Sequence, residues 1–179
     1  MKCLPVPSSS GTSAIFPSGF SICKRVRKGK GRTVEFKRPV SVLVVIHSPE
    51  LEVLLLERAA HPGYWQSVTG SQEEGESLQE TAQREVAEET GIIAPPDAFR
   101  DWQTSNRFEI FAEWSHRYAP GVTHNLEHVF SLMVPQASPV RIAPDEHLAW
   151  CWLPWREAAQ KCFSWSNRDA ILRLGERGN

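Results

Sequence analysis

The chain has 179 residues, of which 41% are apolar and 23% are charged, values typical of one globular domain with a sizeable core. Its formal net charge at pH 7 is −1, so composition predicts neither a stable nucleic-acid partner nor an acidic-membrane surface. No apolar run approaches the roughly 20 residues that cross a bilayer, and the four cysteines lack metal-type CxxC spacing. We therefore expect a cytoplasmic protein with reduced thiols and no membrane partner, of undetermined oligomeric state.

The first 35 residues differ in composition from the rest of the chain. Ser, Pro and Gly are frequent up to Gly19, and a basic run extends from Lys24 to Arg32. Pro17, Ser18 and Gly19 interrupt the apolar stretch that a signal peptide would need. We expect residues 1–35 to form a disordered basic leader, or to be an artefact of start-site choice, and residues 36–177 to form the domain.

Beyond residue 36 the apolar pattern predicts a mixed α/β protein. Residues 40–46 (VSVLVVI) form a continuous β-branched run, typical of a central strand covered on both faces. Residues 52–57 form a second predicted strand, and residues 65–69 an extended segment. Further strands are expected at residues 99–104, 108–116 after a turn near Asn106, 127–134 and 148–153. Helices are expected from Pro154 to about Lys161 and over residues 166–175, giving an α/β sandwich with helices on both faces of a mixed sheet.

Residues 70–92 (GSQEEGESLQETAQREVAEETGI) are the most informative segment of the chain. The Ser77–Glu80 spacing is that of a capping box and predicts that a helix begins at Ser77. Gly91 is placed where a helix C-terminal glycine is expected. Apolar residues repeat every four positions along this helix and predict a buried stripe: Leu78, Ala82 and Val86.

The same helix carries a cluster of carboxylates. Glu85, Glu88 and Glu89 stand at i, i+3 and i+4, so their side chains share one face. Like charges at this spacing repel by a few tenths of a kcal/mol, roughly, and a divalent cation would convert that cost into a binding site. Carboxylate oxygens suit Mg²⁺, with Mn²⁺ as a substitute. A solvated acidic helix face is the alternative.

This segment resembles the signature of the Nudix hydrolases, in which Gly, Glu, Arg-Glu, Glu-Glu and Gly recur at fixed spacing. All its positions are filled here: Gly70, Glu76, Arg84, Glu85, Val86, Glu88, Glu89, Gly91 and Ile92. The resemblance implies a Nudix-type α/β/α sandwich and metal-dependent hydrolysis of a phosphoanhydride. It implies that Glu85 and Glu89 bind metal, with Glu88 in the same acidic and catalytic cluster. Glu76 and Arg84 are expected to support the loop and helix by an ion pair.

The resemblance extends outside this segment, to Nudix hydrolases that act on a pterin triphosphate. Residues 37–41, 65–70, 116–123 and 164–168 carry it. It implies a further metal-binding or general-base carboxylate at Glu146, although an ordinary loop acid is the alternative and Asp145 a weaker candidate. It also implies a set of substrate-binding residues: Lys37, Arg58, Thr69, Phe108, Glu109, Ile110, Phe111 and Ser164. Lys37 and Arg58 suit phosphate oxygens, and Glu109 could accept N–H donors of a flat ring.

The activity implied is Mg²⁺-dependent release of pyrophosphate from 7,8-dihydroneopterin 3′-triphosphate, a step of folate biosynthesis. Within the same family the substrate could instead be a nucleoside triphosphate, an oxidised nucleotide or a dinucleoside polyphosphate. A binding module that retained the fold without turnover is a third hypothesis. It predicts a damaged carboxylate signature, whereas every position is intact here.

Overall fold

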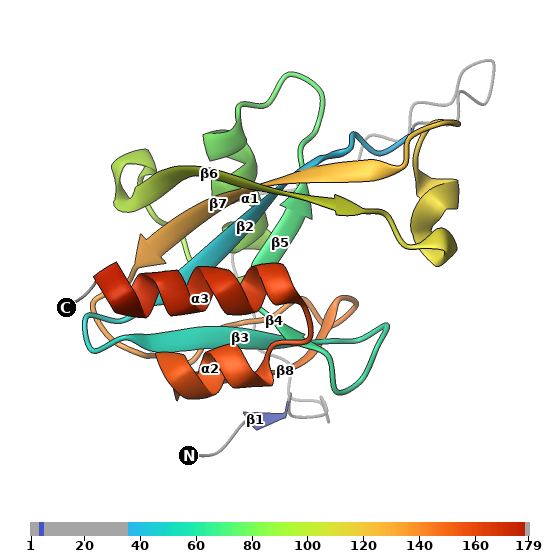
Figure 1. Ribbon diagram of the computed structural model, residues 1–179. Coiled ribbons are helices and arrows are strands. Elements are labelled where there is room, and N and C mark those ends of the chain that lie inside the picture. The colour runs from blue at the N-terminus through green and yellow to red at the C-terminus, as the bar shows by residue number, and fades with distance from the viewer. Residues whose placement is uncertain (1–3, 6–35, 178–179) are drawn as a thin grey trace, which may run out of the picture.

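The computed structural model describes residues 4–5 and 36–177 (Figure 1). Most of the predicted leader therefore lies outside the described residues, and its disorder stays a prediction. Leu4–Pro5 forms the short strand β1, which pairs antiparallel with Ala149 and Trp150. None of the helices in residues 36–177 is long and apolar enough to cross a membrane.

A mixed sheet forms the centre of the molecule. Its path is β1-β8-β3-β2-β7-β6, with β4 paired to β3 and β5 to β2. Strands β2 and β7 run parallel, whereas the other pairs are antiparallel. The strands are β2 (Val40–His47), β3 (Glu52–Arg58), β4 (Trp65–Gln66), β5 (Val68–Ser71), β6 (Phe99–Glu109), β7 (His124–Met133) and β8 (His147–Pro154).

Helices cover both faces of this sheet, as the continuous apolar run of β2 predicts. Val42 and Val44 point to the core under α1 (Leu78–Thr90), where Val86 contributes. Leu43 and Val45 point to the opposite core, which α2 (Trp155–Lys161) and α3 (Trp165–Arg177) cover (Figure 1). Alternate residues of one strand thus join two cores, because successive side chains point to opposite faces. The predicted α/β sandwich with a mixed sheet is confirmed.

Helix α1 begins and ends as its local sequence predicts. Ser77 is the N-cap, and both hydrogen bonds of the capping box with Glu80 are present. Gly91 ends the helix in the left-handed conformation, with φ of 71°, where glycine avoids the steric cost of a Cβ. Of the predicted stripe, Ala82 and Val86 are fully buried and Leu78 packs at its edge.

The prediction of two strands separated by a turn near Asn106 is wrong. A single strand, β6, runs from Phe99 to Glu109, with a register shift against β7 between Asp101 and Ser105. Gln103 has a φ of 52° within this irregularity, which bends the strand without ending it. The predicted strand beyond residue 109 is instead a 3₁₀ helix, η2 (Ala112–Arg117). A second short one, η1 (Pro96–Ala98), precedes β6.

Candidate active site

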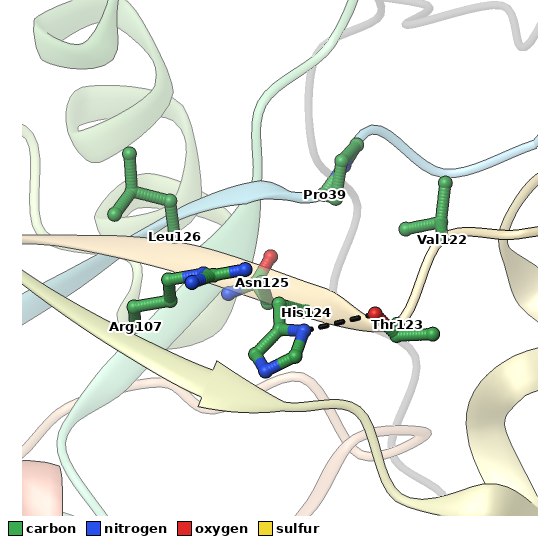
Figure 2. A pocket seen from close by; sticks show the side chains of 7 residues that line it. All are labelled: Pro39, Arg107, Val122, Thr123, His124, Asn125 and Leu126. Carbon is green, nitrogen blue, oxygen red and sulfur yellow. Dashed lines mark hydrogen bonds between the residues drawn. The ribbon is translucent and has the colours of Figure 1, made fainter.

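A cavity of about 860 Å³ opens between β7, the N-terminal ends of β8 and α3, and the face of α1 that carries the carboxylates. Its lining includes all twelve residues predicted for catalysis, metal or substrate: Lys37, Arg58, Thr69, Glu85, Glu88, Glu89, Phe108, Glu109, Ile110, Phe111, Glu146 and Ser164. Their roles stay predictions. A smaller hollow of about 330 Å³ near Pro39, Arg107 and residues 122–126 contains none of them (Figure 2).

Gly70 allows the carboxylate of Glu85 to lie against strand β5. A Cβ built on Gly70 would lie 1.7 Å from Cδ of Glu85, so any larger residue would displace that carboxylate. Glu85 is buried beside Arg84, whose Nη1 lies 2.8 Å from Glu85 Oε1. The glycine of the signature is therefore explained by a close approach of side chain to backbone.

Arg84 and Glu76 tie the loop after β5 to α1 without lining the cavity. Arg84 Nε donates to Glu76 Oε1 at 2.6 Å, and Nη2 donates to Glu76 Oε2 and to the carbonyl of Ser71, each at 3.0 Å. The hydrogen bonds from Arg84 lower the pKa of Glu76 to about 2. This bidentate pair matches the supporting ion pair that the resemblance implies.

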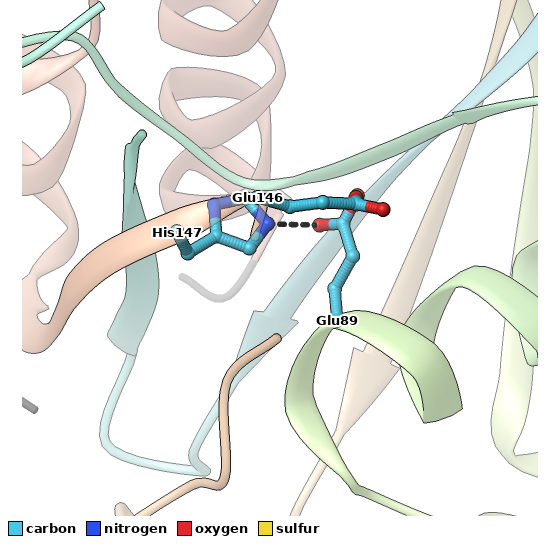
Figure 3. Close-up of side chains that lie close together, drawn as sticks. All are labelled: Glu89, Glu146 and His147. Carbon is cyan, nitrogen blue, oxygen red and sulfur yellow. Dashed lines mark ion pairs between the residues drawn. The ribbon is translucent and has the colours of Figure 1, made fainter. Parts of the chain in front are cut away.

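Two carboxylates and one imidazole lie close together in the cavity: those of Glu89, Glu146 and His147 (Figure 3). Glu89 projects from α1, Glu146 lies in the turn before β8 and His147 is the first residue of β8, and their ligand atoms all lie within 4.8 Å of one another. The loop before β8 is held in place because the amide of Ala59 donates to the carbonyl of Glu146 at 2.8 Å. The expectation that Glu146 reaches across to the helix agrees with this placement. His147 was not predicted, because one histidine at the start of a strand has no distinguishing pattern.

Two observations fit this group to a divalent cation. Glu89 is 3% exposed, and its Oε2, although 3.1 Å from His147 Nε2, has no hydrogen bond among the described residues. Burial raises the pKa of Glu89, and burial raises the pKa of Glu85 to about 7. Burial raises both pKa values despite the neighbouring Arg84 and His147, so a bound cation would offset the cost of burying these carboxylates. Glu88 is 63% exposed at its side chain and lies at the edge of the cavity.

Basic side chains face these acids across the cavity. Burial lowers the pKa of Arg58 and of Lys37, and both feel the charges of Glu146 and Arg117. Arg58 Nη1 donates to Gln66 Oε1 at 2.8 Å, and Gln66 in turn donates to Thr69 Oγ1 at 3.0 Å. Arg58 Nε is buried and has no hydrogen-bond partner in the described part of the chain. We name as the charged cluster Lys37, Arg58, Glu85, Glu89, Arg117 and Glu146.

Another part of the cavity lining lies along β7 and contains no basic side chain among the residues described next. Asn125 and Glu127 are buried there, and Phe108 of β6 lies directly opposite Asn125. Ser166, in the first turn of α3, lines the same cavity. We name these four residues, Phe108, Asn125, Glu127 and Ser166, the β7 wall. Asn125 and Glu127 were not predicted to be in the site, because in sequence they look like polar positions of an alternating strand.

The protein is an α/β/α sandwich in which a helix that carries carboxylates faces basic side chains across a cavity. This arrangement is typical of enzymes that process phosphate compounds. A profile of the NUDIX domain matches residues 37–174. The chain therefore belongs to the Nudix hydrolase family, as its signature predicts.

Named relatives cover nearly the same segment. The chain is 49% identical over 139 residues to the dihydroneopterin triphosphate diphosphatase of Escherichia coli, covering 76% of this chain and 91% of that protein. It is 39% identical over 144 residues to the Haemophilus influenzae protein of the same name, covering 78% of this chain and 89% of that protein. The solved structure of the E. coli dihydroneopterin triphosphate pyrophosphohydrolase superposes with a TM-score of 0.73 and 46% identity, covering 79% of this chain and 98% of that one.

Proposed function

We propose that this protein hydrolyses 7,8-dihydroneopterin 3′-triphosphate to the monophosphate and pyrophosphate, with Mg²⁺ as its metal and Mn²⁺ as a substitute. The observation that carries the proposal is the cavity itself. It combines the charged cluster, which suits a triphosphate and its metal, with the uncharged and aromatic side chains that suit a flat heterocycle. The name shared by relatives at 49% and 39% identity supports this substrate over other phosphoanhydrides.

Residues of the charged cluster have separable roles in this proposal. Arg58 and Lys37 bind phosphate oxygens, and their lowered pKa values reflect the burial that strengthens such contacts. Thr69, held by Gln66, contributes a hydroxyl beside them. Glu76 and Arg84 hold the loop and helix in the geometry that the carboxylates need.

The metal is proposed to be held by Glu85, Glu89 and Glu146, with Glu88 at the edge of the same group. When bound, it supplies charge neutralisation of phosphate oxygens and activation of water. Glu146, exposed at the start of β8 beside Glu89, is the proposed general base, because it combines access to water with proximity to the buried carboxylate. His147 packs against Glu89 and orients it.

The ring-binding residues are proposed to be aromatic and neutral side chains of the cavity lining. Phe111 and Trp114 pack edge to face with centroids 5.2 Å apart, and Arg58 lies 5.6 Å above the Trp114 ring. Phe108, Ile110 and Ser164 also line the cavity and are proposed to contact the flat ring of the substrate.

Product analysis tests this proposal. Incubation of dihydroneopterin triphosphate with the protein and Mg²⁺, followed by ³¹P NMR, is expected to yield pyrophosphate and a monophosphate in equal amounts. Glu89→Gln, prepared in parallel, controls for contaminating phosphatases. Stepwise release of inorganic phosphate, or no turnover of the pterin, would refute the proposal.

A further inference from the structure

Glu127 is a buried carboxylate in the β7 wall that the catalytic roles above leave unused. It is 5% exposed, and none of the ion pairs among the described residues includes it. Asn106 Nδ2 donates to Glu127 Oε2 at 3.3 Å, and the hydroxyl of Ser166 also hydrogen-bonds to this carboxylate. Burial raises its pKa, and no cation of the charged cluster opposes that effect. Both of these hydrogen-bond donors are neutral, so the remaining lone pairs of the carboxylate suit further neutral N–H donors.

Asn125 lies two residues earlier on β7, and its side chain therefore points to the same face of the sheet. It is 4% exposed, and its Nδ2 donates to Ser41 Oγ at 2.7 Å. Its Oδ1, however, has no hydrogen-bond partner within residues 36–177. A buried acceptor left unpaired is costly, so a ligand that supplies a donor at this point gains affinity. Asn125 and Glu127 both line the cavity, beside Phe108, and each carries a buried side-chain acceptor.

The pyrimidine edge of a pterin presents the complementary groups. Its ring N–H and its exocyclic amino group lie side by side and provide parallel donors, which match the two oxygens of one carboxylate. The amino group has a second hydrogen that needs another acceptor. Guanine carries the same pair of donors, hypoxanthine lacks the amino group, and adenine lacks the ring N–H at this edge.

We propose that Glu127 and Asn125 select the substrate by its donor edge, with Glu127 accepting the ring N–H and one amino hydrogen and Asn125 accepting the other. This inference rests on the proposed function for the pterin itself, but it predicts selectivity for any triphosphate with that edge. Asn106 and Ser166 orient the Glu127 carboxylate by donating to it. Glu127 fits this task better than Glu109, because Glu109 is exposed and water can replace a missing donor there.

The first arm of the test uses the wild-type protein and two nucleotides that differ by one amino group. We expect kcat/KM to be at least about tenfold higher for GTP than for ITP, because ITP leaves buried acceptors unpaired. Equal values for GTP and ITP would overturn the inference. This arm needs no variant, so it decides the question even if a substitution at position 127 prevents folding.

The second arm uses Glu127→Gln, which keeps the shape of the side chain but replaces one acceptor with a donor. We expect kcat/KM to fall about 100-fold or more for dihydroneopterin triphosphate and GTP, and to stay within about threefold for ATP. Glu157→Gln is the matched control, since Glu157 is exposed on α2 and outside the cavity, and it should change none of these values. A uniform loss across all substrates would overturn edge recognition and reduce Glu127 to a structural role.

The two arms also separate this inference from the proposed function. If the wild-type protein prefers GTP over the pterin, the proposed function fails, while the GTP-to-ITP ratio still tests Glu127. If the pterin is preferred but GTP and ITP are equal, the function stands and the inference fails.

Discussion

The charged cluster and the β7 wall line one cavity but are built from the chain in different ways. Glu85 and Glu89 lie one helical turn apart on α1, so local spacing brings them together. Asn125 and Glu127 meet their partners only through the fold: Glu127 accepts from Asn106 of β6, and Asn125 donates to Ser41 of β2, across separations of 21 and 84 residues. The helical carboxylates of the charged cluster are thus brought together by local spacing, whereas the proposed substrate-selecting residues are assembled by the fold.

The strongest way to break this distinction is Glu89→Gln. The substitution removes one negative charge from the proposed metal site but keeps its shape, so we expect kcat to fall by about 10³-fold for every substrate. The metal-free variant should be at least as stable as the wild type, because burial of the Glu89 carboxylate is costly and raises its pKa. Steady-state kinetics and thermal unfolding measure both effects. Near-normal turnover at saturating Mg²⁺ would show that Glu89 does not bind the metal.

Gly70→Ala sharpens the assignment of Glu85. The added Cβ would collide with the flexible carboxyl end of Glu85, so the carboxylate should move while the backbone stays folded. We expect Mg²⁺ affinity to fall about 10- to 100-fold, as it does when a ligand loses its orientation. Calorimetric titration with Mg²⁺ measures the change. An unaltered Mg²⁺ affinity together with an intact fold would remove Glu85 from the metal site.

Arg58→Ala probes phosphate binding within the charged cluster. If Arg58 binds the ground state and transition state equally, KM should rise about 10- to 100-fold and kcat should change little. The ratio of kcat/KM for GTP and ITP should not change, since that ratio depends on the β7 wall. A pure kcat defect would instead place Arg58 on charge that develops in the transition state, and a changed ratio would mean that the two regions are not separable.

Glu76→Gln should give the smallest effect, a loss of about 1 kcal/mol of stability near pH 7. The pKa of Glu76 is lowered to about 2 from a usual value of 4.5, so its stabilising effect is fully present above pH 4.5 and is lost as the pH falls toward 2. The difference between the two proteins in urea denaturation should therefore shrink below pH 4.5. Glu74→Gln, at an exposed neighbouring position, is the control. A difference that persists unchanged at pH 2.5 would contradict the assigned ion pair.

Sequence predicted α1 well because its determinants are local. The capping box, the C-terminal glycine and the repeat of apolar residues each act within a few positions, and all are present in the structure. The path of β6 was mispredicted for the opposite reason. Its run Thr104-Ser105-Asn106 has the composition of a turn, yet pairing with β7 keeps Ser105 and Asn106 in the strand. The same non-local pairing brings Asn106 to Glu127, a contact that local sequence does not indicate.

The most direct test of the account is a side-by-side measurement of kcat/KM with Mg²⁺ for dihydroneopterin triphosphate, dATP and 8-oxo-dGTP. The charged cluster treats the three triphosphates alike, so any difference among them comes from the rest of the cavity. We expect the highest value for the pterin, an intermediate value for 8-oxo-dGTP, which retains the donor edge, and the lowest value for dATP. Equal or faster turnover of dATP would contradict the account, leaving a Nudix hydrolase whose β7 wall does not select the substrate.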